Sequence, residues 1–495
     1  MIVHGLCGRL NLPEGTQLGH NSKAPRTLDR RGRCSVMTKK CAGIVLAAGK
    51  GTRMKSRLPK VLHTVCGLPM VEYAVRALRD AGIERPIVVI GHEGHLVQQE
   101  LGDSCDYVWQ HEQKGTGHAA LQAQELLKDY HGPVVITAGD TPLLEGDVIR
   151  RLLERCFEFR AHVMVAAFTL EDPSGYGRIV RDKLGGLLRI VEHRDAYEEV
   201  LGIKEVNAGV YCFDCRTLFD LLPTLGTDNK QGEFYLTDMV SRIVRHQGVA
   251  EVECFDNSSD FFGVNDRWEL AQAERVLRTR ILRRLAMDGV TIRDPNSVMV
   301  GPDVRIGKET VIEAFTSLVG RTEIGADCRI GPNALIENST IGDGCLVYMS
   351  RLQGAMLGNR IKVGPFANLR PGAELADEVK VGNFVEIKKA RLAEEVAASH
   401  LSYIGDAEIG PRTNIGAGTI TCNYDGLRKH RTVVGADAFI GSDTTLVAPV
   451  TVGEGAIIAA GSTITEDVPD NAMAIARQRQ EVKPEWASQW RKKQK

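Results

Sequence analysis

The sequence predicts an α/β protein in which an N-terminal domain with a mostly parallel β-sheet is joined by one helix to a C-terminal parallel β-helix. In the first half, short apolar runs alternate with helical patterns, which is typical of a parallel sheet covered by helices. In the second half, an aliphatic residue recurs at every sixth position, a period that fits a coil of short strands. The expected segments are a disordered or non-native leader (1–40), the α/β domain (41–265), a linker helix (266–290), the β-helix (291–475) and a tail (476–495).

Composition argues against several classes of partner. The 495 residues carry 62 Lys+Arg and 63 Asp+Glu, a net charge of −1, so we expect no surface for nucleic acid. No apolar run approaches the roughly 20 residues of a membrane span. The 12 cysteines are irregularly spaced, which favours a reducing cytoplasm, and the lone C-x-x-C, Cys212–Cys215, predicts neither zinc nor redox chemistry. We therefore predict a cytoplasmic protein that binds neither nucleic acid nor membranes.

The leader differs from the rest of the chain. Residues 1–40 carry eight basic and two acidic residues and no periodic apolar face. They also lack the apolar core of a secretory signal. Met37 lies four residues before the first expected strand. We expect residues 1–36 to be disordered or to lie upstream of the true start.

The first strong apolar run, Ile44–Ala48, leads into a loop suited to a polyphosphate. Two glycines let the backbone turn close to a ligand, and Arg53 and Lys60 add a forked and a point-like cation. The loop is not a dinucleotide-binding fingerprint, because Met54 takes the place of a third glycine, and it is not a Walker A loop. The alternative is that both cations are solvated surface residues.

Three further apolar runs, Ile87–Ile90, Val134–Ile136 and Val163–Leu170, continue the expected sheet. Ligands of such sheets bind at the carboxyl ends of the strands. Asp140 lies just beyond the run that ends at Ile136, so its carboxylate is a natural ligand for Mg²⁺ beside bound phosphates. The alternative is that Asp140 is a turn or helix-capping residue.

A series of motifs occurs in one order along this domain: LAAGKGTRM, LPKVLH, GDTPLL, GYGRIV, VEHRDA, NAGVY and GVND. In this order they resemble the uridylyltransferase half of the bacterial bifunctional N-acetylglucosamine-1-phosphate uridylyltransferase/glucosamine-1-phosphate acetyltransferases. The resemblance implies a Rossmann-like nucleotidyltransferase domain, with one departure at Ala138, where many relatives have Tyr. The positions that match ligand-binding residues are, for UTP and UDP-N-acetylglucosamine, Leu46, Ala47, Ala48, Gly49, Lys60, Gln110, Gly115, Thr116, Gly177, Glu192, Asn207 and Asn265, and, for Mg²⁺, Asp140 and Asn265.

The reaction implied for this half joins two anions. An oxygen of the sugar 1-phosphate attacks the α-phosphorus of UTP, so positioning and charge neutralisation dominate over proton chemistry. We expect Arg53 and Lys60 to act as the catalytic cations, with Mg²⁺ as the cofactor.

The linker shows the spacing of a single helix. Its aliphatic residues are Leu270, Ala273, Leu277, Ile281 and Leu285. Gly289 follows where a glycine at the helix C-terminus would lie. The arginines between the aliphatic positions, Arg280 among them, are expected to form a solvated face.

Three trains of aliphatic residues at every sixth position run through Ile306–Ile336, Val363–Ile387 and Val434–Ile464. Each repeat would lay one aliphatic inward and turn at a glycine-rich corner. Similarity to known hexapeptide-repeat proteins implies a left-handed coil that assembles as a homotrimer. The alternative is that the coil is only a spacer.

His400 interrupts the repeat and is the expected general base for acetyl transfer, with a structural histidine as the alternative. The amine must lose a proton before it attacks a thioester, and an imidazole near its unperturbed pKa can accept that proton. Glu386 is expected to orient the imidazole. The insertion Ala417–Arg431 is expected to leave the coil as a loop, whose basic cluster 428–431 could also serve coenzyme A phosphates. The resemblance implies Arg370, Lys388, Tyr403 and Asn414 for the acceptor sugar phosphate, and Ala417, Asn423, Tyr424, Ser442, Ala460 and Arg477 for acetyl-CoA, partly across a trimer interface.

The resemblance implies one bifunctional enzyme. It would acetylate glucosamine 1-phosphate from acetyl-CoA, then transfer uridylyl from UTP to give UDP-N-acetylglucosamine, a precursor of peptidoglycan and lipopolysaccharide, and pyrophosphate. Two alternatives stay open: a monofunctional sugar-nucleotide pyrophosphorylase whose β-helix only oligomerises it, and a non-catalytic regulatory homologue. The basic tail is expected to form a closing helix followed by a loose end.

Overall fold

The structure is a computed structural model that describes residues 27–28, 34–35 and 40–494. Within the expected leader, Thr27–Leu28 (β1) and Cys34–Ser35 (β2) pair antiparallel. The remainder of the expected leader up to residue 39 lies outside the described residues.

The N-terminal domain is built on a nine-stranded sheet with the order β11-β10-β12-β8-β3-β6-β7, in which β9 also pairs with β12 and β13 pairs with β9. Its strands are β3 (Ala42–Ala47), β6 (Ile87–Ile90), β7 (Asp106–Trp109), β8 (Pro133–Ala138), β9 (Val163–Thr169), β10 (Arg178–Arg181), β11 (Leu187–Val191), β12 (Glu205–Asp214) and β13 (Ala250–Phe255). β3 pairs parallel with β6 and β8, as the alternation of runs and helices predicts. The sheet is mixed rather than mostly parallel, because β12 runs antiparallel to β8, β9 and β10.

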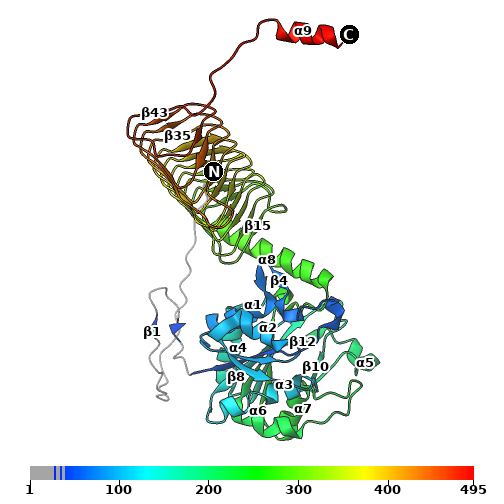
Figure 1. Cartoon of the computed structure of the whole chain (residues 1–495). Coiled ribbons are helices and arrows are strands. Elements are labelled where there is room, and N and C mark those ends of the chain that lie inside the picture. The colour runs from blue at the N-terminus through cyan, green and yellow to red at the C-terminus, as the bar shows by residue number, and fades with distance from the viewer. Residues whose placement is uncertain (1–26, 29–33, 36–39, 495) are drawn as a thin grey trace, which may run out of the picture.

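Helices cover both faces of this sheet (Figure 1). One face packs against α1 (Met70–Asp80), α2 (Gly94–Leu101) and α4 (Gly146–Phe159). The other face packs against α3 (Thr116–Leu121), α6 (Cys215–Leu221) and α7 (Asp238–Arg245). The neighbouring β3 residues Ile44 and Val45 belong to opposite cores, as successive strand side chains should.

Helix α8 (Arg267–Met287) joins the two halves, as the linker spacing predicts. Its N-cap Asp266 accepts from the amides of Trp268 and Glu269. Ala273 and Leu285 are buried in the core cluster that also fills the β-helix. The first half of the chain therefore reaches the coil through a packed, rather than flexible, connection.

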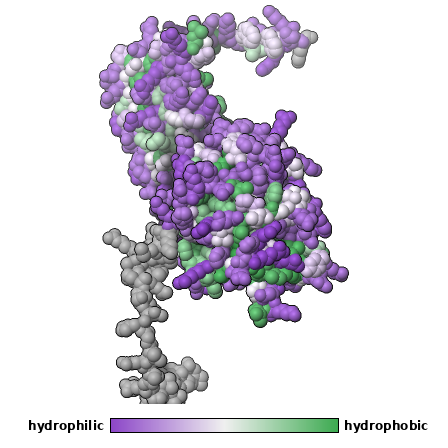
Figure 2. All heavy atoms as spheres, turned by 90° about the horizontal axis from the view of Figure 1, so that it is seen from below, coloured by the Kyte–Doolittle hydropathy of each residue, from purple (hydrophilic) through white to green (hydrophobic). Residues whose placement is uncertain are grey.

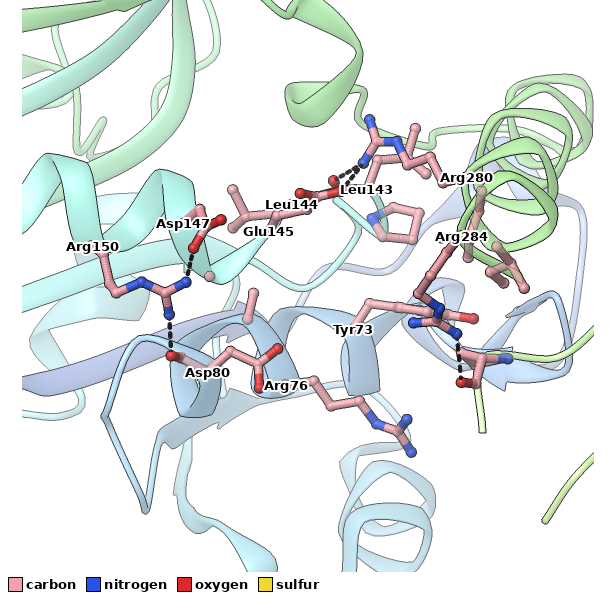
Figure 3. Close-up of a pocket in the computed structure, with 16 residues that line it drawn as sticks. Tyr73, Arg76, Asp80, Leu143, Leu144, Glu145, Asp147, Arg150, Arg280 and Arg284 are labelled. Atoms are coloured by element: carbon pink, nitrogen blue, oxygen red, sulfur yellow. Dashed lines mark hydrogen bonds and ion pairs between the residues drawn. The ribbon is translucent and has the colours of Figure 1, made fainter. Parts of the chain in front are cut away.

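A cavity of about 680 Å³ lies where α8 meets α1, the loop 142–145 and the start of α4 (Figure 3). Arg280 of α8 donates to the carbonyl of Leu143 and pairs with Glu145 and Asp260, while Arg150 pairs with Asp147. The expectation that Arg280 belongs to a solvated face is wrong, since its side chain is only 23% exposed. The cavity contains none of the sequence-predicted site residues, so we interpret it as part of the joint between α8 and the domain.

Replacing Arg280 by Ala should weaken this joint. The change leaves the Asp260 carboxylate without its guanidinium partner, so we expect the free energy of unfolding to fall by about 1.5–3 kcal/mol. Thermal unfolding followed by intrinsic fluorescence measures this loss. Arg283→Ala on the exposed side of the same helix is the matched control and should leave the transition in place. An Arg280→Ala transition equal to that of the control would contradict the assignment.

The C-terminal half is a parallel β-helix whose faces are sheets of 11, 10 and 9 strands, running from β14 (Thr291–Ile292) to β43 (Met473–Ala474). Up to the last coils, where β41 pairs with β43, each strand pairs with the strand three positions on, so each of these coils contributes one strand to each face. The predicted inward aliphatics are buried, as at Ile312 and Leu318, except that Ile306 in the first coil is half-buried. The strands that carry the second site are β27 (Asn368–Leu369), β29 (Lys380–Asn383), β30 (Glu386–Lys388), β32 (Ala397–His400), β33 (Tyr403–Gly405), β35 (Asn414–Ile415) and β36 (Ile420–Cys422).

Glycine at the repeat corners has a packing reason. A Cβ on Gly416 would lie 2.5 Å from the amide nitrogen of Ser442 in the next coil. Larger side chains at such positions would separate the coils and break the parallel ladders.

The tail ends in α9 (Trp486–Lys493), which buries no residue and lies beyond the far end of the coil (Figure 1). It does not close the coil as expected. Hydrophilic side chains predominate on the face seen in Figure 2. Among the described residues, no helix combines the length and apolar character that crossing a membrane requires.

Candidate active sites

The loop after β3 folds back on itself at Gly51. This glycine adopts φ +57°, and a Cβ there would lie 2.5 Å from the Cβ of Lys60. The turn Thr52–Met54 (η1) follows, with Met54 buried as its anchor. The close packing of Gly51 against Lys60 fixes both predicted cations on one side of the loop.

Four predicted side chains meet at the carboxyl edge of the sheet. Lys60 forms an ion pair with Asp140, and Arg53 donates to Oδ1 of Asn265 at 2.8 Å. Lys60 Nζ also lies 3.5 Å from Asn265 Oδ1. The amide of Val264 donates to the carbonyl of Asp140 at 2.9 Å, which ties the two segments together. β3 and β8 are adjacent parallel strands, so the residues that follow them reach the same edge.

This arrangement fits a divalent cation. An Asp140 carboxylate oxygen and the Asn265 amide oxygen converge on the Lys60 ammonium, so a positive charge at this point has two oxygen partners. Mg²⁺ is held by few protein oxygens together with waters and substrate phosphates. Within the described part of the chain, no three or more His, Cys, Asp or Glu side chains are grouped so that they could hold a metal ion by themselves. The donor set therefore suits Mg²⁺ rather than a metal that needs a dense protein cage.

The positions predicted to bind the nucleotide lie at and beyond the ends of β3 and β7 in the same sheet. Leu46, Ala47, Ala48 and Gly49 lie at and just beyond the end of β3. The buried Gln110 side chain donates to the carbonyl of Gly115 at 3.0 Å. Thr116 Oγ1 accepts from the amide of Leu236 at 3.0 Å. His118 lies next to these residues, with its Nδ1 3.0 Å from the side-chain nitrogen of Gln110. The sequence did not predict this neighbour, because no motif contains it.

The three positions predicted to bind the amino sugar also come together. The backbone amide of Asn207 donates to the Gly177 carbonyl at 2.9 Å. A Cβ on Gly177 would lie 3.6 Å from Glu192 Oε2, so glycine leaves space beside that carboxylate. Burial raises the pKa of the Glu192 carboxyl, although the Thr237 hydroxyl donates to it at 2.9 Å. Thr237 was not predicted, and only the fold brings it near Glu192.

In the β-helix, His400 ends β32 and is exposed, with Nδ1 2.8 Å from Oδ1 of Asn383. The expectation that Glu386 orients His400 is wrong. Glu386 accepts instead from Arg370 at 2.9 Å and from Asn368 at 3.2 Å. The reason is topological: Glu386 lies on β30 and His400 on β32, and these strands belong to different faces of the coil.

Cations crowd together at the other edge of the β30 face. The Lys429 amine, at hydrogen-bonding distance, and then the charge of Arg370 lower the pKa of Lys388. Like charges held this close indicate a site for an anion such as a sugar phosphate. Tyr403 and Asn423 adjoin, with the Asn423 amide 3.5 Å from the Tyr403 hydroxyl. Lys429 was predicted only within a basic cluster for coenzyme A, because its approach to Lys388 depends on the loop's fold.

The predicted acetyl-CoA positions Ala417, Ser442 and Ala460 stack in a column above His400. The register of β32, β35 and the following strands places them at one position on successive coils. Backbone bonds continue the stacking, from Asp443 N to Ala417 O at 2.7 Å and from Gly461 N to Ser442 O at 2.8 Å. Parallel strands lie about 4.8 Å apart, so this column extends about 14 Å from His400. Arg477 lies at its far end, beside Gly461. Asn414 lies on β35, next to the His400 strand.

The insertion is shorter than expected. Ile420–Cys422 stays in the coil as β36, so the loop comprises 423–431 instead of the whole of Ala417–Arg431. Within it, the amides of Leu427 and Arg428 donate to Asp425, whose other oxygen lies 2.6 Å from His430 Nε2. These contacts hold the pKa of Asp425 well below its usual range. Tyr424 is exposed at the start of this ordered loop.

Known proteins match both halves. Residues 43–207 match the family model of the MobA-like NTP transferase domain, and residues 303–338 and 431–466 match that of the bacterial transferase hexapeptide (six repeats). A bifunctional protein GlmU of Geobacillus sp. (strain WCH70) is 46% identical over 88% of this chain and 95% of its own length. Those of Staphylococcus haemolyticus and Caldanaerobacter subterraneus subsp. tengcongensis are 48% and 47% identical, over 89% and 91% of this chain and 98% of each relative. These matches confirm the expected fold class, and the chain belongs to the GlmU family of bifunctional proteins.

Proposed function

We propose that this protein is a bifunctional enzyme that acetylates glucosamine 1-phosphate from acetyl-CoA and then joins the product to UTP, giving UDP-N-acetylglucosamine and pyrophosphate. The observation that carries the proposal is the meeting of Arg53, Lys60, Asp140 and Asn265 at the carboxyl edge of the sheet, where β3 also ends. Product analysis with all substrates tests it. We place the reaction in the cytoplasm, where UTP and acetyl-CoA are available.

The uridylyl step needs alignment and neutralisation of charge. A phosphate oxygen of N-acetylglucosamine 1-phosphate attacks the α-phosphorus of UTP, and the bond to the departing pyrophosphate breaks. Arg53 and Lys60 lie where their charges offset the repulsion between the two anions. When bound at Asp140 and Asn265, Mg²⁺ supplies electrostatic stabilisation of the phosphates. Glu192 and Asn207 would fix the sugar through hydrogen bonds.

The acetyl step needs a base. His400 Nε2 accepts a proton from the ammonium of glucosamine 1-phosphate, and the free amine attacks the thioester carbonyl of acetyl-CoA. The tetrahedral intermediate then collapses to the amide: its nitrogen loses a second proton, and the departing thiolate of coenzyme A takes up that proton. Arg370, Lys388 and Lys429 would hold the sugar phosphate, while Ala417 and Ser442 leave room for the acetyl-CoA arm.

We further propose that the active enzyme is a homotrimer. In one chain, the cations and His400 occupy opposite edges of the β30 face, so a neighbouring coil would complete the site. An exposed apolar column supports this view: Phe366, Phe384 and Leu401 lie at one corner of three successive coils, and Phe315 lies at the same corner three coils before Phe366. Phe366 and Phe384 stack with ring centroids 5.3 Å apart. Such a column is a natural interface between copies of the chain.

Replacing Phe366 by Asp should prevent trimer assembly. A carboxylate cannot be buried in an apolar interface without a partner, so we expect monomers by light scattering coupled to gel filtration. Acetyl transfer should fall about a hundredfold, because the two parts of the site lose their alignment. Leu184→Asp in the α/β domain, at a residue 96% exposed, is the control and should stay trimeric. A trimeric, fully active Phe366→Asp variant would contradict the proposed interface.

A further inference from the structure

His400 has one polar partner among the described residues, and that partner is an amide. Asn383 and His400 occupy the same position on consecutive coils, as the register of β29 and β32 records. Their side chains meet with Nδ1 2.8 Å from Oδ1. The adjacent backbone supports the pair, since the amide of Leu401 donates to the carbonyl of Asn383 at 2.9 Å.

The identity of the partner atom determines the protonation of the ring. A carbonyl oxygen accepts hydrogen bonds and cannot donate them, so Nδ1 of His400 carries the proton in this contact. The neutral imidazole then has its lone pair on Nε2, which is the tautomer a general base needs. The same contact limits rotation of an otherwise exposed ring.

We propose that Asn383 is a positioning residue for acetyl transfer, which holds His400 in the tautomer and orientation that present Nε2 to the substrate amine. The inference rests on the proposed acetyl transfer at His400 and adds to it a residue that no sequence motif indicates. An amide fixes the tautomer without adding a negative charge. A carboxylate at the same place would instead favour the imidazolium form.

No charged group near His400 takes the place of Asn383 as the hydrogen-bond partner of the imidazole among the described residues. On the adjacent strands of the same face, β29 carries Lys380, and β35 carries no charged residue. On the next face, Glu386 is engaged by Arg370, and Lys388 lies beside Lys429. Tyr403 of β33 lies 3.5 Å from the Asn423 amide. Among the described residues, none of these groups forms a hydrogen bond or ion pair with the imidazole.

The test compares pH profiles of coenzyme A release by the full chain for Asn383→Ala and Asn383→Asp. Asn383→Ala removes the acceptor, so kcat should fall about tenfold with KM for both substrates nearly unchanged, a smaller loss than the about 10²–10⁴-fold assigned to a whole general base. Asn383→Asp restores the acceptor and adds a negative charge that favours the imidazolium. Its kcat at high pH should therefore recover, while its acid limb moves upward by about one pH unit.

Lys380→Ala, on the same strand, is the matched control and should keep the wild-type profile. Unchanged kcat in Asn383→Ala, or an unmoved acid limb in Asn383→Asp, would overturn the role of Asn383. Wild-type protein that releases no coenzyme A would instead refute the proposed acetyl transfer. Uridylyl transfer, measured in the same samples, should be equal in all variants.

Discussion

Replacing Asp140 by Asn should reduce Mg²⁺-dependent pyrophosphate release by about three orders of magnitude, comparable to the loss of a major electrostatic contact in a transition state. The variant keeps the size of the side chain but removes the negative charge that makes this position a ligand for a hard cation. It also leaves Lys60 without its ion-pair partner. The expected result is a loss of uridylyl transfer with acetyl transfer unaffected.

Pyrophosphate release should be followed with N-acetylglucosamine 1-phosphate and UTP across a range of Mg²⁺ concentrations. Asp147→Asn is the matched control, because Asp147 lies in the first turn of α4 and is largely exposed beside Arg150. It should behave as the wild type. Near-normal activity of Asp140→Asn at all Mg²⁺ concentrations would remove Asp140 from the metal site.

Replacing His400 by Ala should give the opposite phenotype. Removal of a general base typically costs about 10²–10⁴-fold in rate, so release of coenzyme A from acetyl-CoA should nearly cease. A thiol reagent measures this release directly. The same protein, given N-acetylglucosamine 1-phosphate and UTP, should form UDP-N-acetylglucosamine at the wild-type rate, because the two sites lie in different halves of the chain.

That second assay is the internal control for folding and concentration. Unchanged thiol release by His400→Ala would eliminate His400 as the base. A spacer role for the coil is a separate outcome. It would follow if the wild type itself transferred no acetyl group.

Much of the first site could be predicted from the sequence because its residues follow the ends of recognisable strands. The run that ends at Ile136 and the run that ends at Ala48 are strands, and parallel neighbours end at one edge, so Asp140 and Lys60 were expected to meet. The aliphatic period likewise predicts the inward positions of the β-helix. The expected family, fold class and bifunctional assignment are confirmed, whereas the roles of individual site residues remain predictions.

The remaining differences depend on tertiary contacts that periodicity does not encode. The sheet is mixed because β12 enters between β8 and β9 in the opposite direction, and apolar runs look alike in both directions. Glu386 and His400 are close in sequence, yet they lie on different faces of the coil. The side chain that contacts the imidazole is Asn383 instead of Glu386. In the sequence, Arg280 cannot be told from the exposed arginines of the same helix. Only its contact with the loop 142–145 distinguishes it.

The most direct test of the account supplies glucosamine 1-phosphate, acetyl-CoA, UTP and Mg²⁺ to the purified protein and identifies the products by mass spectrometry. The account predicts UDP-N-acetylglucosamine, pyrophosphate and coenzyme A from one polypeptide. Formation of UDP-N-acetylglucosamine only when N-acetylglucosamine 1-phosphate is supplied, with no release of coenzyme A, would contradict it.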